Sequence, residues 1–230
     1  MLLPQNDGIA LEHRHFFMKV YRWMSIGLVL SAAAAWWVYR TPEAARAIIH
    51  DELHFMGLLG IELLLVFVLA AAKDKLSLGA TMFFFMTYCV TTGLTLSVVL
   101  FVYTATSVVT TFCVTAGMFG VMSAYGYFTD HDLASWGHVL LSGLLGLILA
   151  SFANFWLRSA AIDWIVTLSG IVIFTGLIAY DTNKLRALDL TGTIDGSEQQ
   201  EREAIDGALD LYLDFVNLFL KLLRVLGRKK

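Results

Sequence analysis

Long apolar stretches, each close to the length of a bilayer-spanning helix, follow one another through this sequence. A helix rises about 1.5 Å per residue, so roughly 20 mostly apolar residues cross the hydrocarbon core of a bilayer. Hydrophobic residues make up 58% of the chain, which exceeds what the core of a soluble protein requires. We therefore predict an all-α integral membrane protein with about seven transmembrane helices.

The boundaries of the predicted spans follow the charged and turn residues that interrupt the apolar stretches. The spans lie near Met18–Tyr39, Phe55–Ala72, Leu78–Leu100, Ala105–Phe128, Trp136–Trp156, Trp164–Tyr180 and Ile205–Leu226. A polar N-terminal segment, residues 1–17, precedes them. No join is long enough to be a flexible linker between compact units, so we predict one helical membrane domain over residues 18–230.

Small residues recur at helical spacing within the predicted spans. They are Gly57 with Gly60, Gly117 with Gly120, and Ser142 with Gly146 and Ala150. In lipid, small side chains let two helix backbones approach each other closely. We expect these positions to support ordinary packing of the helix bundle.

The distribution of Lys and Arg does not orient the predicted helices. With seven crossings these cations divide evenly between the two sides, so the positive-inside rule does not choose an orientation. A re-entrant last helix is the alternative, because it would move the five cations from Lys221 to Lys230 to the N-terminal side. The length of Ile205–Leu226 favours seven crossings.

Charge and cysteine content exclude several classes of function. The formal net charge is −3 and no long basic run is present, so nothing in the sequence indicates nucleic-acid binding. Cys89 and Cys113 both lie in apolar stretches, where a free thiol packs as a small hydrophobic side chain. We expect neither a disulfide nor a cysteine metal site.

Ionisable residues within the apolar stretches are few, and each costs about 2.5–3.5 kcal/mol to insert. Glu62 lies in the second predicted span, and Asp181 lies at the end of the sixth. Lys73 closes the second span, where a lysine commonly extends its ammonium to the membrane surface. Glu62 either reaches a shared polar cavity or pairs with a cation.

The last span carries a polar stripe of Asp210, Asp214, Asn217 and Lys221. Their spacing places all four on one face of a helix, and the opposite face is almost entirely apolar. Such a stripe belongs in a bundle interior or against a watery cavity, which would make the last helix central. The structural alternative is that Asp210 and Asn217 only satisfy neighbouring backbone groups.

Asp181 and Asp214 are expected to lie at similar depths. Counted from the shared far edge of the antiparallel sixth and seventh spans, their levels differ by four residues, or about 6 Å. Two carboxylates in contact in a poorly solvated site share one proton and titrate in two separate steps. When both are charged, their oxygens suit a hard cation such as Ca²⁺, so protons and metal would compete.

Two stretches near the C-terminus are more specific than the hydrophobic pattern. Gly176–Lys184 reads GLIAYDTNK, and Ala208–Phe219 reads ALDLYLDFVNLF. With the opening Val20–Leu28 (VYRWMSIGL) and the seven-span layout, the sequence resembles the bacterial branch of the Bax inhibitor-1 family, also called YccA-like or transmembrane Bax-inhibitor-motif proteins. The resemblance covers nearly the whole chain.

The resemblance implies a last helix wrapped by the other six. It also implies a pH-sensitive calcium leak governed by an aspartate pair that matches Asp181 and Asp214. In one relative a basic residue matching Lys73 helps to hold the pore closed. That relative has an arginine, whereas a lysine lacks the planar fork needed for bidentate pairing with a carboxylate. The family branch implies the bacterial inner membrane.

Three functions are compatible with these residues. The first is a passive, pH-gated cation leak with Asp181 and Asp214 as sensor and Ca²⁺ site, Ca²⁺ and protons as its ligands, and no tightly bound cofactor. The second, implied by bacterial relatives, is a membrane interaction protein that modulates a membrane-bound ATP-dependent (AAA) protease or a stress pathway. The third is an intramembrane aspartyl protease, which the absence of glycines around Asp214 disfavours. No other enzyme motif occurs, so we predict a protein that is not an enzyme.

Overall fold

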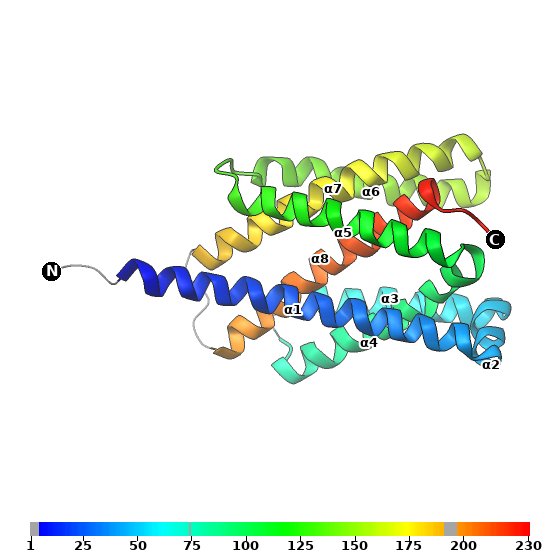
Figure 1. Cartoon of the computed structure of the whole chain (residues 1–230), viewed down its shortest axis with the longest axis horizontal. Helices are drawn as coiled ribbons and strands as arrows, with labels where there is room; N and C mark the ends of the chain where they lie inside the picture. The colour runs from blue at the N-terminus through cyan, green and yellow to red at the C-terminus, as the bar shows by residue number, and fades with distance from the viewer. Residues whose placement is uncertain (1–4, 74, 191–196) are drawn as a thin grey trace. The chain divides into compact units, whose positions relative to one another are not determined.

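The protein is all-helical in the computed structural model, which describes the backbone of residues 5–73, 75–190 and 197–230. Side chains are described for residues 16–49, 51–73, 75–189 and 198–230. No strand occurs among the described residues. Figure 1 shows the helices in chain order: α1 (Gln5–Arg40), α2 (Pro42–Ala45), the π-helix η1 (Arg46–His50), α3 (Glu52–Ala71), α4 (Leu78–Val102), α5 (Ala105–Phe128), α6 (Ala134–Leu157), α7 (Ala160–Leu190) and α8 (Ser197–Leu226).

Local signals in the joins explain where several helices begin and end. The Asp51 side chain accepts the backbone N–H groups of Leu53 and His54 and so caps the start of α3. Thr104 caps α5 in the same way through the N–H of Ser107. Arg158 ends α6 in the left-handed conformation, at φ 48°. These polar joins are the ones from which the spans were predicted.

Five helices, α3 to α7, are long and apolar enough to cross a membrane by length and composition. They coincide with the second to sixth predicted spans. The two outer predictions fall on α1 and α8, which do not meet that criterion in the described part of the chain. Three aspartates and two cations lie within the predicted span of α8 and lower its mean hydropathy. The chain is an integral membrane protein with five candidate spans among its described residues, and the count of seven stays a prediction.

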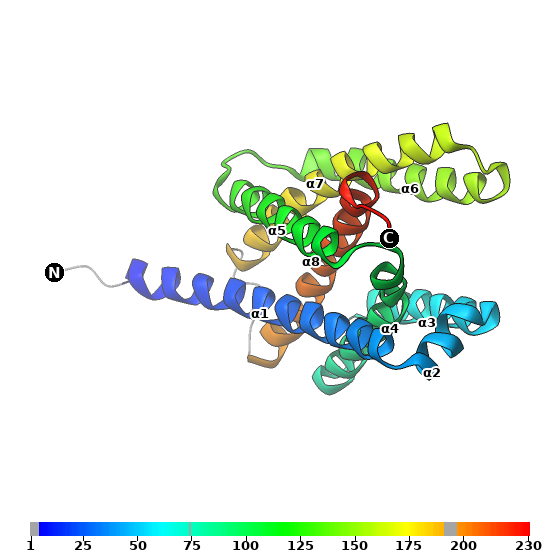
Figure 2. The same cartoon turned by 45° about the vertical axis from the view of Figure 1, so that its right-hand side comes forward.

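Contacts divide the chain into two compact units. Unit 1 comprises Met1–Val102, Asp189–Tyr212 and Lys230, and unit 2 comprises Tyr103–Leu188 and Leu213–Lys229. In unit 1, α4 packs against both α1 and α3. In unit 2, α5, α6 and α7 lie side by side, as Figures 1 and 2 show from two directions. The single helix α8 supplies its first half to unit 1 and its second half to unit 2.

The glycines singled out by spacing are not the ones that bring helices together. A Cβ added at Gly57, Gly60, Gly117, Gly120 or Gly146 would meet no atom within 4 Å among the described residues. By contrast, a Cβ at Gly126 would collide with the backbone of Ala179, and one at Gly137 would collide with the ring of Tyr180. The expectation of close packing at the predicted pairs was therefore wrong, because spacing alone does not show which face of a helix meets a neighbour.

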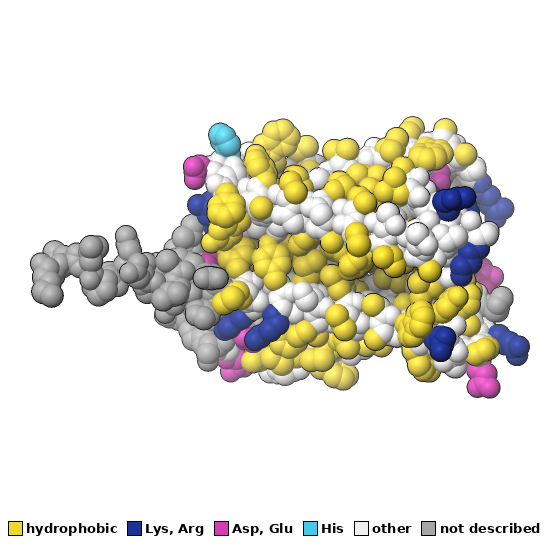
Figure 3. Space-filling view, in the orientation of Figure 1, with side chains coloured by type: hydrophobic (Ala, Val, Ile, Leu, Met, Phe, Trp, Pro, Cys, Tyr) yellow, Lys and Arg dark blue, Asp and Glu magenta, His cyan; other side chains and the backbone are white. Residues whose placement is uncertain are grey.

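Large apolar side chains cover the outside of the predicted spans. Phe67 in α3, Val121 in α5 and Phe155 in α6 are each more than two-thirds exposed. Figure 3 shows one face, on which hydrophobic side chains cover most of the helices and charged side chains gather near the helix ends. Contiguous apolar surface of this extent is rare on a soluble monomer and suits hydrocarbon as the solvent.

Candidate functional site

The polar stripe predicted for the last span lies on α8. The helix places Asp210, Asp214, Asn217 and Lys221 on one face, as the spacing indicated. Asp214 is 5% exposed, whereas the other three residues are half-buried. The amide of Asn217 donates to the backbone oxygen of Leu213 at 2.8 Å. This bond is of the kind that the structural alternative predicted, in which Asn217 satisfies a neighbouring backbone group. A buried carboxylate therefore lies at the middle of the stripe.

Asp181 lies on α7, in the same unit as Asp214. Asp181 is half-buried, and the residue that follows it, Thr182, is fully buried. The hydroxyl of Thr182 is 2.9 Å from that of Ser123 on α5, and the Asn183 amide donates to the backbone oxygen of Gly126. This part of α7 is thus held against α5 by polar contacts next to the predicted sensor residue.

Two contacts within unit 2 show that α7 and α8 run antiparallel. Arg224 of α8 forms an ion pair with Asp163 in the first turn of α7. One turn earlier on α8, the side chain of Lys221 lies over Gly170, where an added Cβ would be 3.0 Å from Lys221 Cε. Counted from the Asp163–Arg224 ion pair, the levels of Asp181 and Asp214 differ by eight residues. Counted from the contact between Gly170 and Lys221, they differ by four. The offset is about 6–12 Å along the helix axes, and the pairing of their carboxylates stays a prediction.

Lys73 follows the end of α3 and contacts the beginning of α8. Its ammonium donates to Glu203 Oε2 at 3.0 Å and lies 3.5 Å from Asp206 Oδ2. Burial lowers the pKa of Lys73, but the hydrogen bond to Glu203 and the negative charges of Asp206 and Asp210 raise it more, so the net shift is upward. Lys73 is therefore a charged partner of the α8 acids.

Glu203 and Asp206 were not singled out from the sequence. They precede Asp214 by eleven and eight residues, which places them on the face that carries Asp210 and Asp214. The stripe therefore begins two turns earlier than predicted. We call Glu203, Asp206, Asp210, Asp214, Asn217 and Lys221 the polar stripe of α8. The helical periodicity was the signal that could have found its first two members.

Glu62 forms a polar contact between α3 and α4 in unit 1. The hydroxyl of Thr95 donates to Glu62 Oε1 at 2.8 Å, and Glu62 is half-buried. A hydroxyl donor stabilises a carboxylate that lies among apolar neighbours. No cation pairs with Glu62 among the described ion pairs, so the cation-pairing alternative has no support there.

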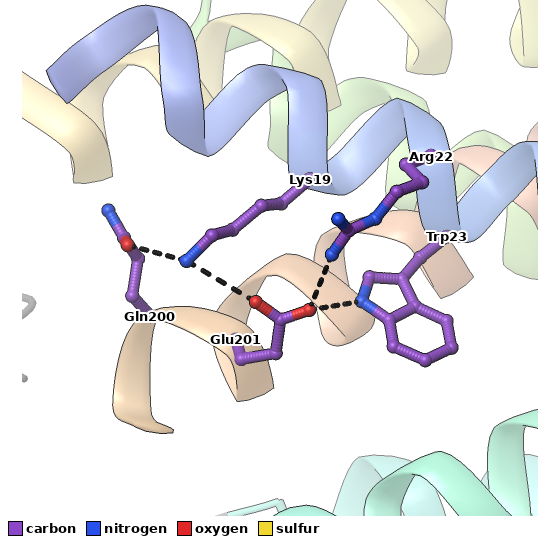
Figure 4. Close-up of polar contacts among 5 residues, drawn as sticks. All are labelled: Lys19, Arg22, Trp23, Gln200 and Glu201. Carbon is purple, nitrogen blue, oxygen red and sulfur yellow. Dashed lines mark hydrogen bonds and ion pairs between the residues drawn. The ribbon is translucent and has the colours of Figure 1, made fainter. Parts of the chain in front are cut away.

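A second carboxylate at the start of α8 binds three donors from α1. Figure 4 shows Glu201 facing Lys19, Arg22 and Trp23. The Trp23 indole N–H donates to Glu201 at 2.7 Å, Arg22 Nη2 lies at 2.9 Å and Lys19 Nζ at 3.3 Å. Lys19 also donates to the side-chain oxygen of Gln200 at 2.8 Å. We call this group the Glu201 clasp.

The Glu201 clasp keeps its carboxylate charged. Burial raises the pKa of Glu201, but hydrogen bonds from Trp23 and Lys19 and the charges of Lys19 and Arg22 lower it more, so the net shift is downward. The three α1 residues have the i, i+3, i+4 spacing of one helical face. This spacing was the sequence signal of a shared partner, which the charge count for orientation did not use.

The described residues contain no group of three or more His, Cys, Asp or Glu side chains that could hold a metal ion. Carboxylates are instead distributed along the α8 stripe. A helix with acids at its start and cations toward its end can attract cations, exchange protons and pair with neighbouring helices. Each of these properties suits a transport or signalling role within a membrane.

A family model described as "Inhibitor of apoptosis-promoting Bax1" matches residues 13–230 of the chain. The chain is also similar to an Escherichia coli (strain K12) protein named "Inner membrane protein YbhL", with 44% identity over 230 residues. That match covers 99% of this chain and 98% of the relative.

Two further relatives come from other bacteria. An "Uncharacterized protein" of Borreliella burgdorferi is 40% identical over 228 residues, covering 99% of this chain and 98% of the relative. The "Uncharacterized protein YrjE" of Lactococcus lactis is 35% identical over 225 residues, covering 97% and 93%. None of these names states an enzymatic activity.

Proposed function

This chain belongs to the Bax inhibitor-1 family, and from this premise we propose that it is a passive, pH-sensitive cation leak that carries Ca²⁺ across the membrane. The observation that carries the proposal is the burial of Asp214, 5% exposed, on a helix with a continuous polar stripe. Ionisable groups in membrane helices persist mainly where they are paired, hydrated or used. A stripe of this kind supports a hydrated route along α8.

Protonation of Asp181 and Asp214 is the proposed gate. If the two carboxylates come into contact, they share one proton, because two negative charges in a poorly solvated site repel each other strongly. Loss of that proton lowers the barrier to a cation, and Ca²⁺ then competes with protons for the same oxygens. Ca²⁺ is the transported ion here, and no tightly bound cofactor is proposed.

The other members of the stripe extend the route. Asp210 and Asn217 lie one turn on either side of Asp214 and offer further oxygen atoms to a passing cation. Glu62, held by Thr95, is proposed as an additional acidic group of the same system.

The contact of Lys73 is proposed as the closing contact at one end of α8. Its ammonium forms ion pairs with Glu203 and Asp206, the first carboxylates of the stripe. A tethered cation in that position repels an incoming cation and holds the end of α3 to α8. Lysine serves here as a point charge shared between two carboxylates, which does not require the planar fork of arginine.

The proposed architecture has seven crossings with α8 at the centre. Support comes from the length of α1 and α8, from the membership of α8 in both units and from its burial. Residues 1% exposed or less recur through α8, at Ala204, Ile205, Ala208, Leu211, Tyr212, Leu218 and Leu223. The similarity to an inner membrane protein of E. coli supports the bacterial inner membrane as its location.

Calcium flux into proteoliposomes tests this function. The purified chain is compared with Asp181→Asn, Asp214→Asn and the double variant between about pH 5 and 8, a range in which a coupled carboxylate pair can titrate. We expect flux that depends on pH in the native chain and loses this dependence in each variant. An absence of calcium flux from the native chain at every pH would contradict the proposal.

A second candidate function is that of a membrane interaction protein, with an AAA protease as the proposed partner. The observation in its favour is that α1 begins at Gln5, so most of the polar N-terminal segment continues the first helix. A helix that extends past the predicted span offers a surface to a partner. Co-purification of a protease that is lost when residues 1–17 are deleted would support this function, and an unchanged set of bound proteins would count against it.

A further inference from the structure

A buried hydroxyl pair connects α8 to α1 in unit 1. The hydroxyl of Tyr212 is 2.6 Å from Ser31 Oγ, and Tyr212 is fully buried while Ser31 is 4% exposed. Ser31 Oγ is also 2.7 Å from the backbone oxygen of Cys89 on α4 and 3.0 Å from that of Gly27. One serine thus joins α1, α4 and α8.

The number of hydrogens limits the directions of these bonds. Ser31 has one hydroxyl hydrogen, and both backbone oxygens near it can only accept. When Ser31 donates to one of these oxygens, the Tyr212 hydroxyl donates to Ser31 Oγ. Every polar atom of the pair is satisfied in this arrangement, which favours its persistence in an apolar core.

Close packing around Tyr212 leaves little freedom to slide or turn. A Cβ added at Gly27 would lie 2.8 Å from Cys89 Sγ and 3.3 Å from the Tyr212 ring. The rings of Phe85 and Tyr88 meet the Tyr212 ring edge-to-face, with centroids 6.4 and 5.9 Å away. A shift of α8 along α1 would break the hydroxyl bond and these ring contacts together.

The Glu201 clasp provides a second attachment between the same two helices. Glu201 precedes Tyr212 by eleven residues, or about 16 Å, and shares its face of α8. On α1, Trp23 precedes Ser31 by eight residues, or about 12 Å. Because the contacts occur in the same order on both helices, α1 and α8 run parallel here and are fixed at two levels.

The stripe lies on the other side of α8 from these attachments. Asp210 and Asp214 are each two residues from Tyr212, which is about 200° around a helix of 3.6 residues per turn. Glu203 is related to Glu201 in the same way. A rotation of α8 large enough to move the stripe would therefore have to break contacts at both levels.

We propose that Ser31, Tyr212 and the Glu201 clasp are positioning residues that fix the rotation and register of α8 on α1, so that the polar stripe faces away from α1 and toward the cation route. This inference rests on the proposed function for the existence of the route. The attachments themselves are independent of it.

A double-mutant cycle, read out by thermal unfolding, tests whether the two hydroxyls act as one unit. Unfolding temperatures of the full chain in detergent are measured for Ser31→Ala, Tyr212→Phe and the double variant. We expect each single variant to lose about 2–4 °C and the double variant to lose no more than the larger single loss. Additive losses would overturn the assignment of the bond. Tyr88→Phe, which removes the hydroxyl of a neighbouring tyrosine and keeps its ring, provides the matched control for loss of a phenolic hydroxyl.

Cysteine labelling tests the positioning role. A water-soluble maleimide is applied to membranes containing Asn217→Cys, on the stripe, or Leu218→Cys, which replaces a fully buried side chain. The background carries Cys113→Ser, because Cys113 is exposed, and keeps the buried Cys89. We expect strong labelling at 217 and little at 218. Tyr212→Phe combined with Glu201→Gln is expected to lower the ratio of the two several-fold, whereas Tyr88→Phe leaves it unchanged.

The outcomes separate the two proposals. If position 217 labels in the parent chain but the ratio is unchanged when both attachments are removed, the positioning role is overturned and the cation route stands. If position 217 does not label in the parent chain, the hydrated route of the proposed function is overturned, and the positioning role fails with it.

Discussion

Lys73 donates a hydrogen bond to Glu203 at 3.0 Å, and its ammonium is also 3.5 Å from Asp206. One cation therefore faces two carboxylates, which leaves surplus negative charge at the start of the α8 stripe. The Lys73 side chain is 40% exposed, so water screens the contact and limits its free energy. At the Glu201 clasp the balance is reversed, since two cations and an indole N–H meet one carboxylate. The two contacts at the start of α8 thus differ in strength.

We predict that Lys73→Gln raises calcium flux. Loss of a partly exposed ion pair is expected to change the free energy of closure by about 0.5–1 kcal/mol, which corresponds to about a two- to fivefold increase. Flux into proteoliposomes at neutral pH measures the effect. Lys75→Gln, an exposed lysine in the same turn, is the control and should leave flux unchanged. Equal increases in both variants would show that overall charge, and not the Glu203 contact, is responsible.

Asp210→Asn should reduce calcium flux without abolishing its pH dependence. The substitution removes one charge from the stripe but leaves Asp181 and Asp214, which we propose to be the sensor. The expected reduction is a few-fold and is measured over the same pH range as the sensor variants. Glu198→Gln, which removes an exposed charge from the first turn of α8, controls for net charge. Complete loss of pH dependence in Asp210→Asn would show that Asp210 belongs to the sensor, against the proposal that Asp181 and Asp214 form it.

Glu201→Gln should destabilise the protein at neutral pH and much less in acid. The folded-state pKa of Glu201 lies below its ordinary value, so the clasp contributes fully above that value and is lost as the pH falls through the folded pKa. We expect a loss of about 1–2 kcal/mol in the free energy of unfolding near pH 7. Thermal unfolding in detergent near pH 7 and below about pH 4 measures it. A penalty that is the same at both pH values would show that the charge of Glu201 is not what the clasp uses.

Gly93→Ala should destabilise the chain, whereas Gly120→Ala should not. A Cβ at Gly93 would lie 2.7 Å from Ser31 Cα and 2.8 Å from Ala34 Cβ, so the α1–α4 contact would have to open at a cost of about 1–3 kcal/mol. A Cβ at Gly120 meets nothing within 4 Å, and alanine favours the helix by about 0.5–1 kcal/mol. Unfolding temperatures compare the two variants. Equal effects would mean that helix propensity outweighs packing at both sites.

The helices could be predicted from the sequence because charged and turn residues mark their ends. Asp51, Thr104 and Arg158 stand at helix ends in the structure, close to the predicted boundaries. The spans of α3 to α7 each contain a long window with few charged residues, so hydropathy finds them directly. The stripe on α8 followed from spacing, since Asp210, Asp214 and Asn217 repeat at helical intervals.

Contacts between distant segments could not be predicted in the same way. Glu201 and Trp23 are separated by 178 residues, and nothing in the local sequence of either one names the other. The glycines show the same limit. Gly93 is tightly packed and Gly120 is open, although both stand in similar apolar surroundings, because packing depends on which face meets another helix. Glu203 and Asp206 were missed for a simpler reason, since the periodic stripe was traced only as far as Asp210.

The sharing of α8 between the two units has a consequence for how the protein is made. Unit 1 contains the first helices to be synthesised, yet the partners of its cations come much later in the chain. Gln200 follows Lys19 by 181 residues, and Glu203 follows Lys73 by 130 residues. During translation, Lys19 and Ser31 of α1 and Lys73 after α3 are therefore made before their partners on α8 exist. A chain terminated before α8 leaves its first half unfinished as well as its second. The last helix thus completes both units at once, so an incomplete copy carries a defect at its very beginning.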